Sequence, residues 1–383
     1  MVWFWEIISP PWAGAAKWIF KCFEIWVLKL LHRTLTPVDS PQGPRIRLDG
    51  RDFINFASND YLGLANHPEV VKAFKFAVDQ YGVGSGSAHL ICGHSKSHHA
   101  LEEELAEFTG RDRALLFSAG YMANMGVIST LLGRGDAVFE DRLNHASLLD
   151  GGLISEARFK RFRHADVENL REQLHNSSTT NKLIVTDGVF SMDGDFAPVT
   201  ELSRLSLDND AWLMVDDAHG LGVLGEQGRG LLSHSGLSQD EVPVLVGTLG
   251  KAFGTFGAFV AGSESLIETL IQKSRTYIYT TALPPAIAEA TRASLKRVIA
   301  DDWRREKLIQ LIKRFRSGAR QIGLQLMDSE SAIQPILIGD NQRTVDVSNI
   351  LLNAGILISA IRSPTVPMGS ARLRITFSAL HEE

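Results

Sequence analysis

The sequence predicts an α/β fold in which helices cover both faces of a mostly parallel sheet, followed by a second, smaller lobe. Strand-like and helix-like segments alternate over residues 113–283, which is the pattern of a parallel sheet with crossover helices. Some strand-like segments are continuous apolar runs, such as residues 183–185, and this is typical of strands buried on both faces. A long helical pattern over residues 285–322 then leads into the second lobe.

The individual elements follow from local patterns along the chain. Residues 46–56 predict a hairpin, because the Asp49-Gly50 pair favours the positive φ of a tight turn. Helical spacing predicts helices over residues 68–80 and 98–108. The strands of the second lobe are predicted over residues 333–338, 356–361 and 373–377. The chain is thereby divided into an N-terminal helix and hairpin segment (1–57), a large domain (58–284) and a small C-terminal domain (285–383).

Composition excludes several classes of function. The chain has 383 residues, of which 44% are hydrophobic and 22% charged, and this is ample for a large core. A net charge of -5 and a pI near 6.2 argue against nucleic-acid binding. The two cysteines, Cys22 and Cys92, provide no disulfide framework and predict a reducing cytoplasm. His98 and His99 precede an acidic helix, so they predict a helix start, and no metal is expected.

The N-terminal segment is rich in tryptophan but is interrupted by charges. No charge-free run in residues 1–33 reaches the roughly 18 residues that a transmembrane helix needs. The main interpretation is a helix packed on the other lobe or on a dimer partner. The alternative is an interfacial membrane anchor, which Trp, Phe and Lys would suit. A secretory signal is disfavoured because Lys and Glu break the apolar stretch.

The segment VLVGTLGKAF (244–253) places Lys251 among glycines at the end of an apolar, strand-like run. Desolvation lowers the pKa of a lysine and frees its amine lone pair for attack on a carbonyl. A lysine that forms a Schiff base needs this property. On its own, the pattern also fits a lysine that extends from a strand end into solvent.

Two other strand-like runs also end in polar side chains. Residues 211–220 end in Asp216, Asp217 and His219. The run over residues 182–195 repeats the design. Its polar residues are Asp187, Ser191, Asp193 and Asp195. In open α/β sheets, ligands bind outside the carboxyl ends of the strands. The three runs therefore predict one site that contains a lysine, an Asp/His pair and a Ser/Asp set.

A fourth segment indicates what this site holds. Residues 113–132 read as a strand, a small-residue turn at Ser118-Ala119-Gly120 and a helix. A turn of this kind that opens a helix presents free N–H groups and the positive end of the helix dipole, which suits a phosphate. Combined with a Schiff-base lysine and a carboxylate for a ring nitrogen, the turn predicts a site for pyridoxal 5'-phosphate.

Longer motifs connect the chain to a known family. They are SNDYLGL (58–64), NHASLLDG (144–151), DGVFSMDGD (187–195), VDDAHGLGVLGEQGRG (215–230), TLGKAFG (248–254) and AIRSPTVPMGSARLRIT (360–376). Together, over about residues 45–383, they resemble the α-oxoamine synthases, pyridoxal-phosphate enzymes of the aspartate-aminotransferase fold. The resemblance implies transferase fold type I, with a mostly parallel, seven-stranded-type sheet between helices in the large domain and a smaller α/β C-terminal domain. The family normally has one further helix after the residue that corresponds to Glu383, so the small domain is expected to be truncated.

The resemblance implies roles for the cofactor-binding residues. Lys251 would hold the cofactor and move protons at the α-carbon, and Asp216 would pair with the ring nitrogen. His219 would bond to the phenolic oxygen of the ring, and His145 would stack on its face. Spacing alone does not choose between Asp216 and Asp217. The remaining expected cofactor contacts are Gly120, Tyr121, Ser191 and Thr248, with Thr280 and Thr281 from the partner subunit.

Substrate recognition is implied in the same way. Arg374 would bind the amino-acid carboxylate, because a planar guanidinium matches a carboxylate bidentately. Arg372 lies two residues away on the same strand face, so the sequence leaves the pair open. Asn59 would assist from the neighbouring subunit. Arg362 and Arg33 would reach the acyl substrate.

The resemblance implies an acyl transfer with loss of carbon dioxide. The motif at residues 360–376 is most similar to the biotin-pathway branch, which condenses L-alanine with a pimeloyl thioester of coenzyme A or acyl-carrier protein to give 8-amino-7-oxononanoate. The alternatives within the family use serine or glycine, as in serine palmitoyltransferase or 2-amino-3-ketobutyrate ligase. From a different class, the alternative is a non-catalytic pyridoxal-phosphate binding protein. A homodimer is expected because the family's sites borrow residues from both chains.

Overall fold

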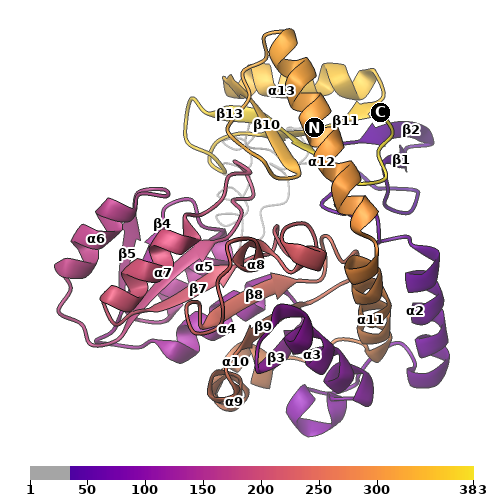
Figure 1. The fold of residues 1–383 in the computed structure, drawn as a ribbon. Coiled ribbons are helices and arrows are strands. Elements are labelled where there is room, and N and C mark those ends of the chain that lie inside the picture. Colours follow the sequence, from indigo (N-terminus) through magenta and orange to yellow (C-terminus); the bar gives the residue numbers. More distant parts are fainter. Residues whose placement is uncertain (1–34) are drawn as a thin grey trace, which may run out of the picture.

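The computed structural model describes residues 35–383, whose strands form three sheets with helices packed around them (Figure 1). The large sheet has seven strands, and every neighbouring pair is parallel except the two pairs that involve β9. In spatial order its strands are β3 (Arg113–Phe117), β9 (Ala258–Gly262), β8 (Val244–Thr248), β7 (Trp212–Asp216), β6 (Lys182–Asp187), β4 (Ala137–Asp141) and β5 (Arg158–Phe162). The predicted mostly parallel, seven-stranded sheet is thus confirmed.

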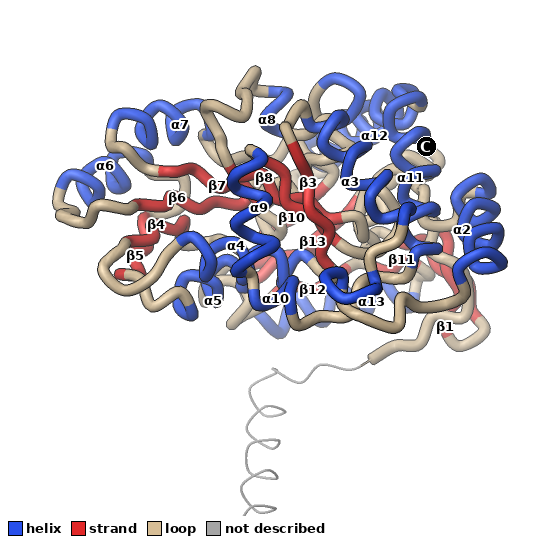
Figure 2. Tube along the Cα trace, turned by 90° about the horizontal axis from the view of Figure 1, so that it is seen from below, coloured by secondary structure: helices blue, strands red, loops and turns tan. Residues whose placement is uncertain are grey.

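Two layers of helices cover this sheet, as Figure 2 shows. The helices on one face are α4 (Gly120–Leu131), α5 (Ala146–Ile154), α9 (Glu264–Lys273) and α10 (Arg275–Ile278). Those on the other face are α6 (Val167–His175), α7 (Val199–Asp208) and α8 (Leu231–His234). Within β6, Leu183 and Val185 pack on the first layer and Ile184 packs on the second. A strand buried on both faces has no polar positions, which is why its sequence is continuously apolar.

The helical pattern over residues 285–322 forms two helices, so the prediction of a single long helix is wrong. The first is α11 (Pro285–Ala300), which packs beside α2 (Pro68–Tyr81) and α3 (Lys96–Thr109). The second is α12 (Asp302–Gln321). Asp301 between them leaves the helical conformation, with φ −99° and ψ 60°, and its carboxylate accepts a hydrogen bond from Nε of Arg304 at 3.0 Å. A short polar side chain that bonds locally offers the backbone an alternative to the helix.

Two small sheets hold the rest of the chain. The hairpin of β1 (Arg45–Leu48) and β2 (Arg51–Asn55) turns at Asp49 and Gly50, which have φ of 48° and 74° as predicted. β11 (Ile356–Leu357) joins this hairpin, whereas β12 (Ser359–Ile361) pairs with β13 (Ala371–Thr376), which also pairs with β10 (Ile333–Gly339). The single strand predicted over residues 356–361 is therefore two strands in two sheets. Between β10 and β11 lies α13 (Asn341–Asn353). The domain boundaries after residues 57 and 284 stay predictions.

Parallel pairing brings the polar ends of the strands to one edge of the large sheet. Asp187 and Asp216, the last residues of β6 and β7, are paired directly in register. β8 is the next strand in the sheet, and Lys251 is the third residue after its end at Thr248. The predictions made for residues 1–34 lie outside the described residues. Within residues 35–383, no helix has the length and apolarity to cross a membrane.

Candidate active site

Lys251 lies in the turn after β8, and its amine contacts a histidine. The Nζ atom is 2.8 Å from Nε2 of His219. The turn is tight, because Gly254 has φ 65° and a Cβ there would lie 2.3 Å from the backbone nitrogen of Ala65. Burial lowers the pKa of Lys251 to about 8, although nearby carboxylates oppose the shift. A lysine with a lowered pKa has more neutral amine near pH 7, and this suits the predicted Schiff-base role.

Two adjacent aspartates end at this edge, and the structure distinguishes them. Asp216 accepts hydrogen bonds from Nδ2 of Asn124 at 2.7 Å and from the Ala218 N–H at 3.0 Å. Asp217 is engaged elsewhere, since the Leu231 N–H donates to its Oδ2 at 2.7 Å. Burial raises the pKa of Asp217 to about 8. Asp217 thus anchors the start of α8, and the geometry favours Asp216 as the partner of a ring nitrogen.

His145 is the N-cap residue of α5, and Asp187 holds its backbone. Oδ2 of Asp187 accepts a hydrogen bond from the His145 N–H at 2.7 Å, and the Asp187 N–H donates to Oδ1 of Asn144 at 3.0 Å. The His145 ring is exposed, with Nδ1 2.7 Å from Oγ of Ser147. Its centroid is 6.3 Å from that of the Tyr121 ring. An exposed ring held at a helix start is suited to stack on a planar cofactor, as predicted.

The first turn of α4 has backbone N–H groups that are available to bind an anion. Ala119 is the N-cap residue and makes no side-chain capping bond, so the first N–H groups of α4 lack a side-chain partner. A Cβ added to Gly120 would meet no heavy atom within 4 Å. In the preceding turn, the Ser118 hydroxyl donates to the carbonyl of Thr281 at 3.3 Å. An uncapped helix start beside open space is a suitable phosphate site.

The other expected cofactor contacts lie around this turn. Tyr121 is exposed in the first turn of α4, and its hydroxyl donates to Asp150. The Thr248 hydroxyl donates to the carbonyl of Gly257 at 3.2 Å. Thr280 is adjacent to Thr281, whose carbonyl contacts the turn within the same chain. The assignment of these two threonines to the partner subunit stays a prediction.

These residues fit pyridoxal 5'-phosphate. Within residues 35–383, the hydrogen bonds to Asp216 come from neutral donors, so no cation is hydrogen-bonded to its carboxylate there. A protonated ring nitrogen would supply that cation, and the uncapped start of α4 would bind the phosphate. Lys251 offers the amine for the aldehyde, and His219 lies beside it. The donor set therefore matches the chemistry of the cofactor.

The two arginines of β13 have different partners, and this difference favours one of them as the carboxylate clamp. Arg372 donates to the carboxylate of Asp193, so its charge is compensated within the fold. Among the described residues, Arg374 bonds to uncharged oxygens: the Ser191 carbonyl at 2.5 Å from Nε, Oδ1 of Asn59 at 3.1 Å from Nη2, and the Tyr61 hydroxyl. This contact of Asn59 lies within one chain, and the expectation that Asn59 assists from the neighbouring subunit stays a prediction. The geometry therefore favours Arg374 for a substrate carboxylate, and this role stays a prediction.

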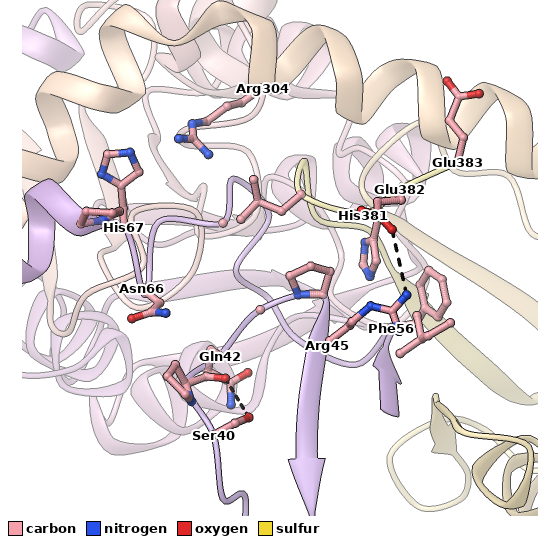
Figure 3. Close-up of a pocket in the computed structure, with 17 residues that line it drawn as sticks. Ser40, Gln42, Arg45, Phe56, Asn66, His67, Arg304, His381, Glu382 and Glu383 are labelled. Atoms are coloured by element: carbon pink, nitrogen blue, oxygen red, sulfur yellow. Dashed lines mark hydrogen bonds and ion pairs between the residues drawn. The ribbon is translucent and has the colours of Figure 1, made fainter. Parts of the chain in front are cut away.

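Two residues were expected at the acyl substrate, and the structure describes one of them, Arg362. Arg33 lies outside the described residues. Arg362 follows β12, next to the strand that carries Arg374. A cavity of about 820 Å³ lies between Arg45, Arg304 of α12 and the last residues of the chain. Figure 3 shows the side chains that line it. None of the predicted site residues within 35–383 lines it, so it is separate from the Lys251 site.

The histidines near the start of α3 also lie close together. Ring nitrogens of His89, His94 and His98 lie within 4.8 Å of one another. Both nitrogens of His98 are engaged, because Nδ1 accepts from the Ser95 N–H at 2.9 Å and Nε2 bonds to the Leu283 carbonyl at 2.7 Å. Ser95 is the N-cap residue of α3, so His98 lies at a helix start as predicted.

Several residues that contact the site were not predicted from the sequence. Tyr61 bonds to His219, Asn124 bonds to Asp216, and Asn144 bonds to Asp187. Tyr61 and Asn144 lie inside the motifs SNDYLGL and NHASLLDG, which was the available signal. Asn124 lies mid-helix in α4, and only the structure shows that a buried amide at this position faces the end of β7.

His164 holds the loop that supplies Ser191 to the site. Its Nδ1 is 3.1 Å from Oδ1 of Asp141 at the end of β4, and its Nε2 is 2.8 Å from Oδ2 of Asp195. Burial disfavours the charged ring, but the two carboxylates outweigh burial and raise the pKa of His164 to about 10. The imidazolium therefore connects the loop after β6 to the sheet.

We expect His164→Gln to destabilise the protein in a pH-dependent way. The pKa of His164 is raised on folding, so its contribution is fully present below the unfolded pKa of about 6.5 and is lost as the pH rises to about 10. At pH 6 the variant should lose about 1–2 kcal/mol, as for a partly exposed, charge-assisted pair of hydrogen bonds. Guanidinium unfolding at pH 6 and pH 10 measures the difference, with the exposed His175→Gln as the control. An equal loss at both pH values would contradict the charged state.

Comparison with known proteins places this geometry in a family. The family model described as "Aminotransferase class I and II" matches residues 51–383. The 8-amino-7-oxononanoate synthase of Methylococcus capsulatus is 65% identical over 90% of this chain and 89% of its own length.

Solved structures agree with this placement. A Sphingomonas wittichii serine palmitoyltransferase superposes with a TM-score of 0.91 at 32% identity, covering 98% of this chain and 95% of that one. A structure described as SPT with a PLP internal aldimine gives a TM-score of 0.90 at 30% identity, with the same coverage. With the match of the family model and the 65% identical relative, the chain belongs to the class I and II aminotransferase family of pyridoxal-phosphate enzymes.

Proposed function

We propose that this protein condenses L-alanine with a pimeloyl thioester, with loss of carbon dioxide, to give 8-amino-7-oxononanoate and the free thiol in biotin biosynthesis. The observation that carries the proposal is the 65% identity to a curated 8-amino-7-oxononanoate synthase over nearly the whole length of both chains. The arrangement of Lys251, Asp216, His219 and Arg374 supports it, because these residues supply an amine, a ring-nitrogen partner and a carboxylate clamp.

The residues of the chain would bind and orient the amino acid. When bound, pyridoxal 5'-phosphate supplies an electron sink for negative charge at the α-carbon. Arg374, held by the Ser191 carbonyl and Asn59, would grip the alanine carboxylate and fix the direction of the bonds at that carbon. His145 would cover one face of the ring system.

Proton transfer would fall to Lys251. Lys251 would hold the cofactor, and with the amino acid bound its Nζ would exchange the proton at the α-carbon. Burial lowers its pKa to about 8, so the amine can take a proton and later return one near neutral pH. His219, within 2.8 Å of Nζ, would keep the amine oriented.

A second candidate function is acyl transfer to another amino acid. The TM-score of 0.91 to a serine palmitoyltransferase over 98% of this chain favours serine as the alternative. At 32% sequence identity, however, that relative is much more distant than the 65% identical synthase. L-Alanine is therefore the amino acid we propose.

The test is a visible-absorbance titration of the cofactor-loaded protein with L-alanine, glycine and L-serine, followed by mass spectrometry of products formed with pimeloyl-CoA. We expect the absorbance change to saturate at the lowest concentration with L-alanine, and 8-amino-7-oxononanoate to accumulate. Saturation by L-serine, with product formed only from a long-chain acyl-CoA, would support the alternative. A loaded protein that responds to none of the three would indicate a non-catalytic binding protein.

The proposed enzyme is a cytoplasmic homodimer. Large apolar side chains lie exposed near the threonines that we assign to the partner's site, with Val83 83% exposed, Ile91 79% and Tyr279 72%. A bridge between Ala88 and Thr281 ties the segment that carries Val83 and Ile91 to these threonines. Such a surface is suited to cover by a second copy of the chain.

A further inference from the structure

Tyr61 lies at the centre of the site without a role in the reaction described above. It is 1% exposed and follows Asn59 in the segment between β2 and α2. Its hydroxyl oxygen is 2.6 Å from Nδ1 of His219 and 3.2 Å from Oδ1 of Asn59. The phenol thus contacts the histidine beside the lysine on one side and the amide beside Arg374 on the other.

The hydrogen bonds around Tyr61 form one consistent chain. Oδ1 of Asn59 can only accept, so the bond between it and Tyr61 uses the Tyr61 O–H as donor. In that arrangement the phenol oxygen, which Arg374 also contacts, accepts from Nδ1–H of His219. A neutral imidazole that donates from Nδ1 has Nε2 as its acceptor. Nε2 is the atom that faces Nζ of Lys251, at 2.8 Å. At the other end, Oδ1 of Asn59 also accepts from Arg374.

The surroundings favour the neutral form of the His219 ring. The ring is buried, and the cations Lys251 and Arg374 lie nearby. Burial first, and these cations next, lower the pKa of His219 well below its usual value. A neutral ring has two tautomers, and its neighbours decide which one is populated. Nδ1 contacts the Tyr61 hydroxyl, so the direction of the hydrogen bond at Nδ1 distinguishes the two tautomers.

We propose that Tyr61 is a positioning residue that holds His219 in the tautomer with Nε2 as the acceptor toward Lys251, and that it links this pair through Asn59 to the Arg374 clamp. The inference rests on the proposed function for its turnover readout. It predicts that the orientations of the Lys251 amine and of the Arg374 clamp depend on each other, because the Tyr61 hydroxyl lies in the row of hydrogen bonds that connects them.

The chain offers a conservative test. Tyr61→Phe removes one oxygen and leaves the ring in the core cluster that contains Leu62 and Leu249. Tyr277→Phe is the matched control, because Tyr277 is also a buried phenol, 5% exposed, packed in the core with its ring stacked on His89. Both variants are loaded with pyridoxal 5'-phosphate and compared with the wild type in kcat, in KM for L-alanine and in the pH midpoint of the visible absorbance.

We expect Tyr61→Phe to lower kcat by about tenfold to a hundredfold, the cost typical of losing an outer-shell orienting bond, and to raise KM for L-alanine. The pH midpoint should shift by about one unit, because Lys251 loses a fixed acceptor. Tyr277→Phe should match the wild type in all three. Kinetic constants within about twofold of the wild type and an unchanged midpoint in Tyr61→Phe would overturn the proposal.

A double-mutant cycle with His219→Asn tests whether Tyr61 acts through the histidine. If it does, Tyr61→Phe should have little further effect on the pH midpoint in that background. Additive shifts would overturn the proposed positioning role. The absorbance readout needs only the loaded protein, so it remains decisive if the protein fails to turn over L-alanine with pimeloyl-CoA, the outcome that would refute the proposed function itself.

Discussion

Replacing Lys251 by alanine is expected to abolish covalent attachment of pyridoxal 5'-phosphate and to lower kcat by at least about 1000-fold. The loss combines the nucleophile that holds the cofactor with the base that moves the substrate proton, and general acid–base catalysis alone contributes about 100- to 10000-fold. Borohydride reduction followed by peptide mass spectrometry measures the attachment. In the wild type the cofactor mass should appear on the peptide that contains Lys251.

The control for this prediction is Lys273→Ala, which removes an exposed lysine at the end of α9 and should leave attachment and turnover unchanged. The pH dependence adds a second readout. Because burial lowers the pKa of Lys251 to about 8, the rate of cofactor loading should rise up to about pH 8 and then level off. A rate that keeps rising to pH 10 would show an ordinary lysine, and cofactor mass retained in Lys251→Ala would show that another residue holds it.

The sequence correctly predicted strands in which every side chain is buried, because such strands are continuous apolar runs. β6 lies between two helical layers, so Leu183, Ile184 and Val185 are all buried and the apolar run marks the strand. At the end of α11 the local signal is limited to the short polar side chain of Asp301. Arg304 is 4% exposed and donates to the carbonyl of Leu62, a contact across more than two hundred residues that helps to set the geometry at the break. Local periodicity therefore predicted one helix where tertiary contacts produce two.

In the site, too, local patterns predicted some residues, and contacts distant in the sequence decided the others. The strand ends placed Lys251, Asp216 and Asp187 at one edge, because parallel strands deliver their carboxyl ends together. Spacing did not choose between Asp216 and Asp217, since adjacent side chains differ only in the partners that the fold brings to them. Leu231 captures Asp217 from fourteen residues away. Partners distant in the sequence are not visible in a local pattern.

The arginine pair of β13 provides a test of this argument. Arg374→Ala is expected to raise KM for L-alanine by about 100-fold. A hydrogen bond between charged groups contributes about 1.5–3 kcal/mol, and the substitution would remove both hydrogen bonds of the bidentate contact. Arg374→Lys keeps the charge but not the planar fork, so we expect a smaller rise, about tenfold. Steady-state kinetics with L-alanine varied at saturating pimeloyl-CoA gives these values.

Arg372→Ala is the matched comparison, since Arg372 lies on the same strand face and is equally buried but donates to Asp193. Removing Arg372 leaves the Asp193 carboxylate without its cation, so the free energy of unfolding should fall by about 2 kcal/mol. The rise in KM for L-alanine should be much smaller than for Arg374→Ala. If Arg372→Ala raised KM for L-alanine as much as Arg374→Ala while leaving the unfolding midpoint unchanged, the clamp would belong to Arg372. The compensated charge of Arg372 argues against that outcome, because a guanidinium already bound to a carboxylate would have to give up one partner to gain another.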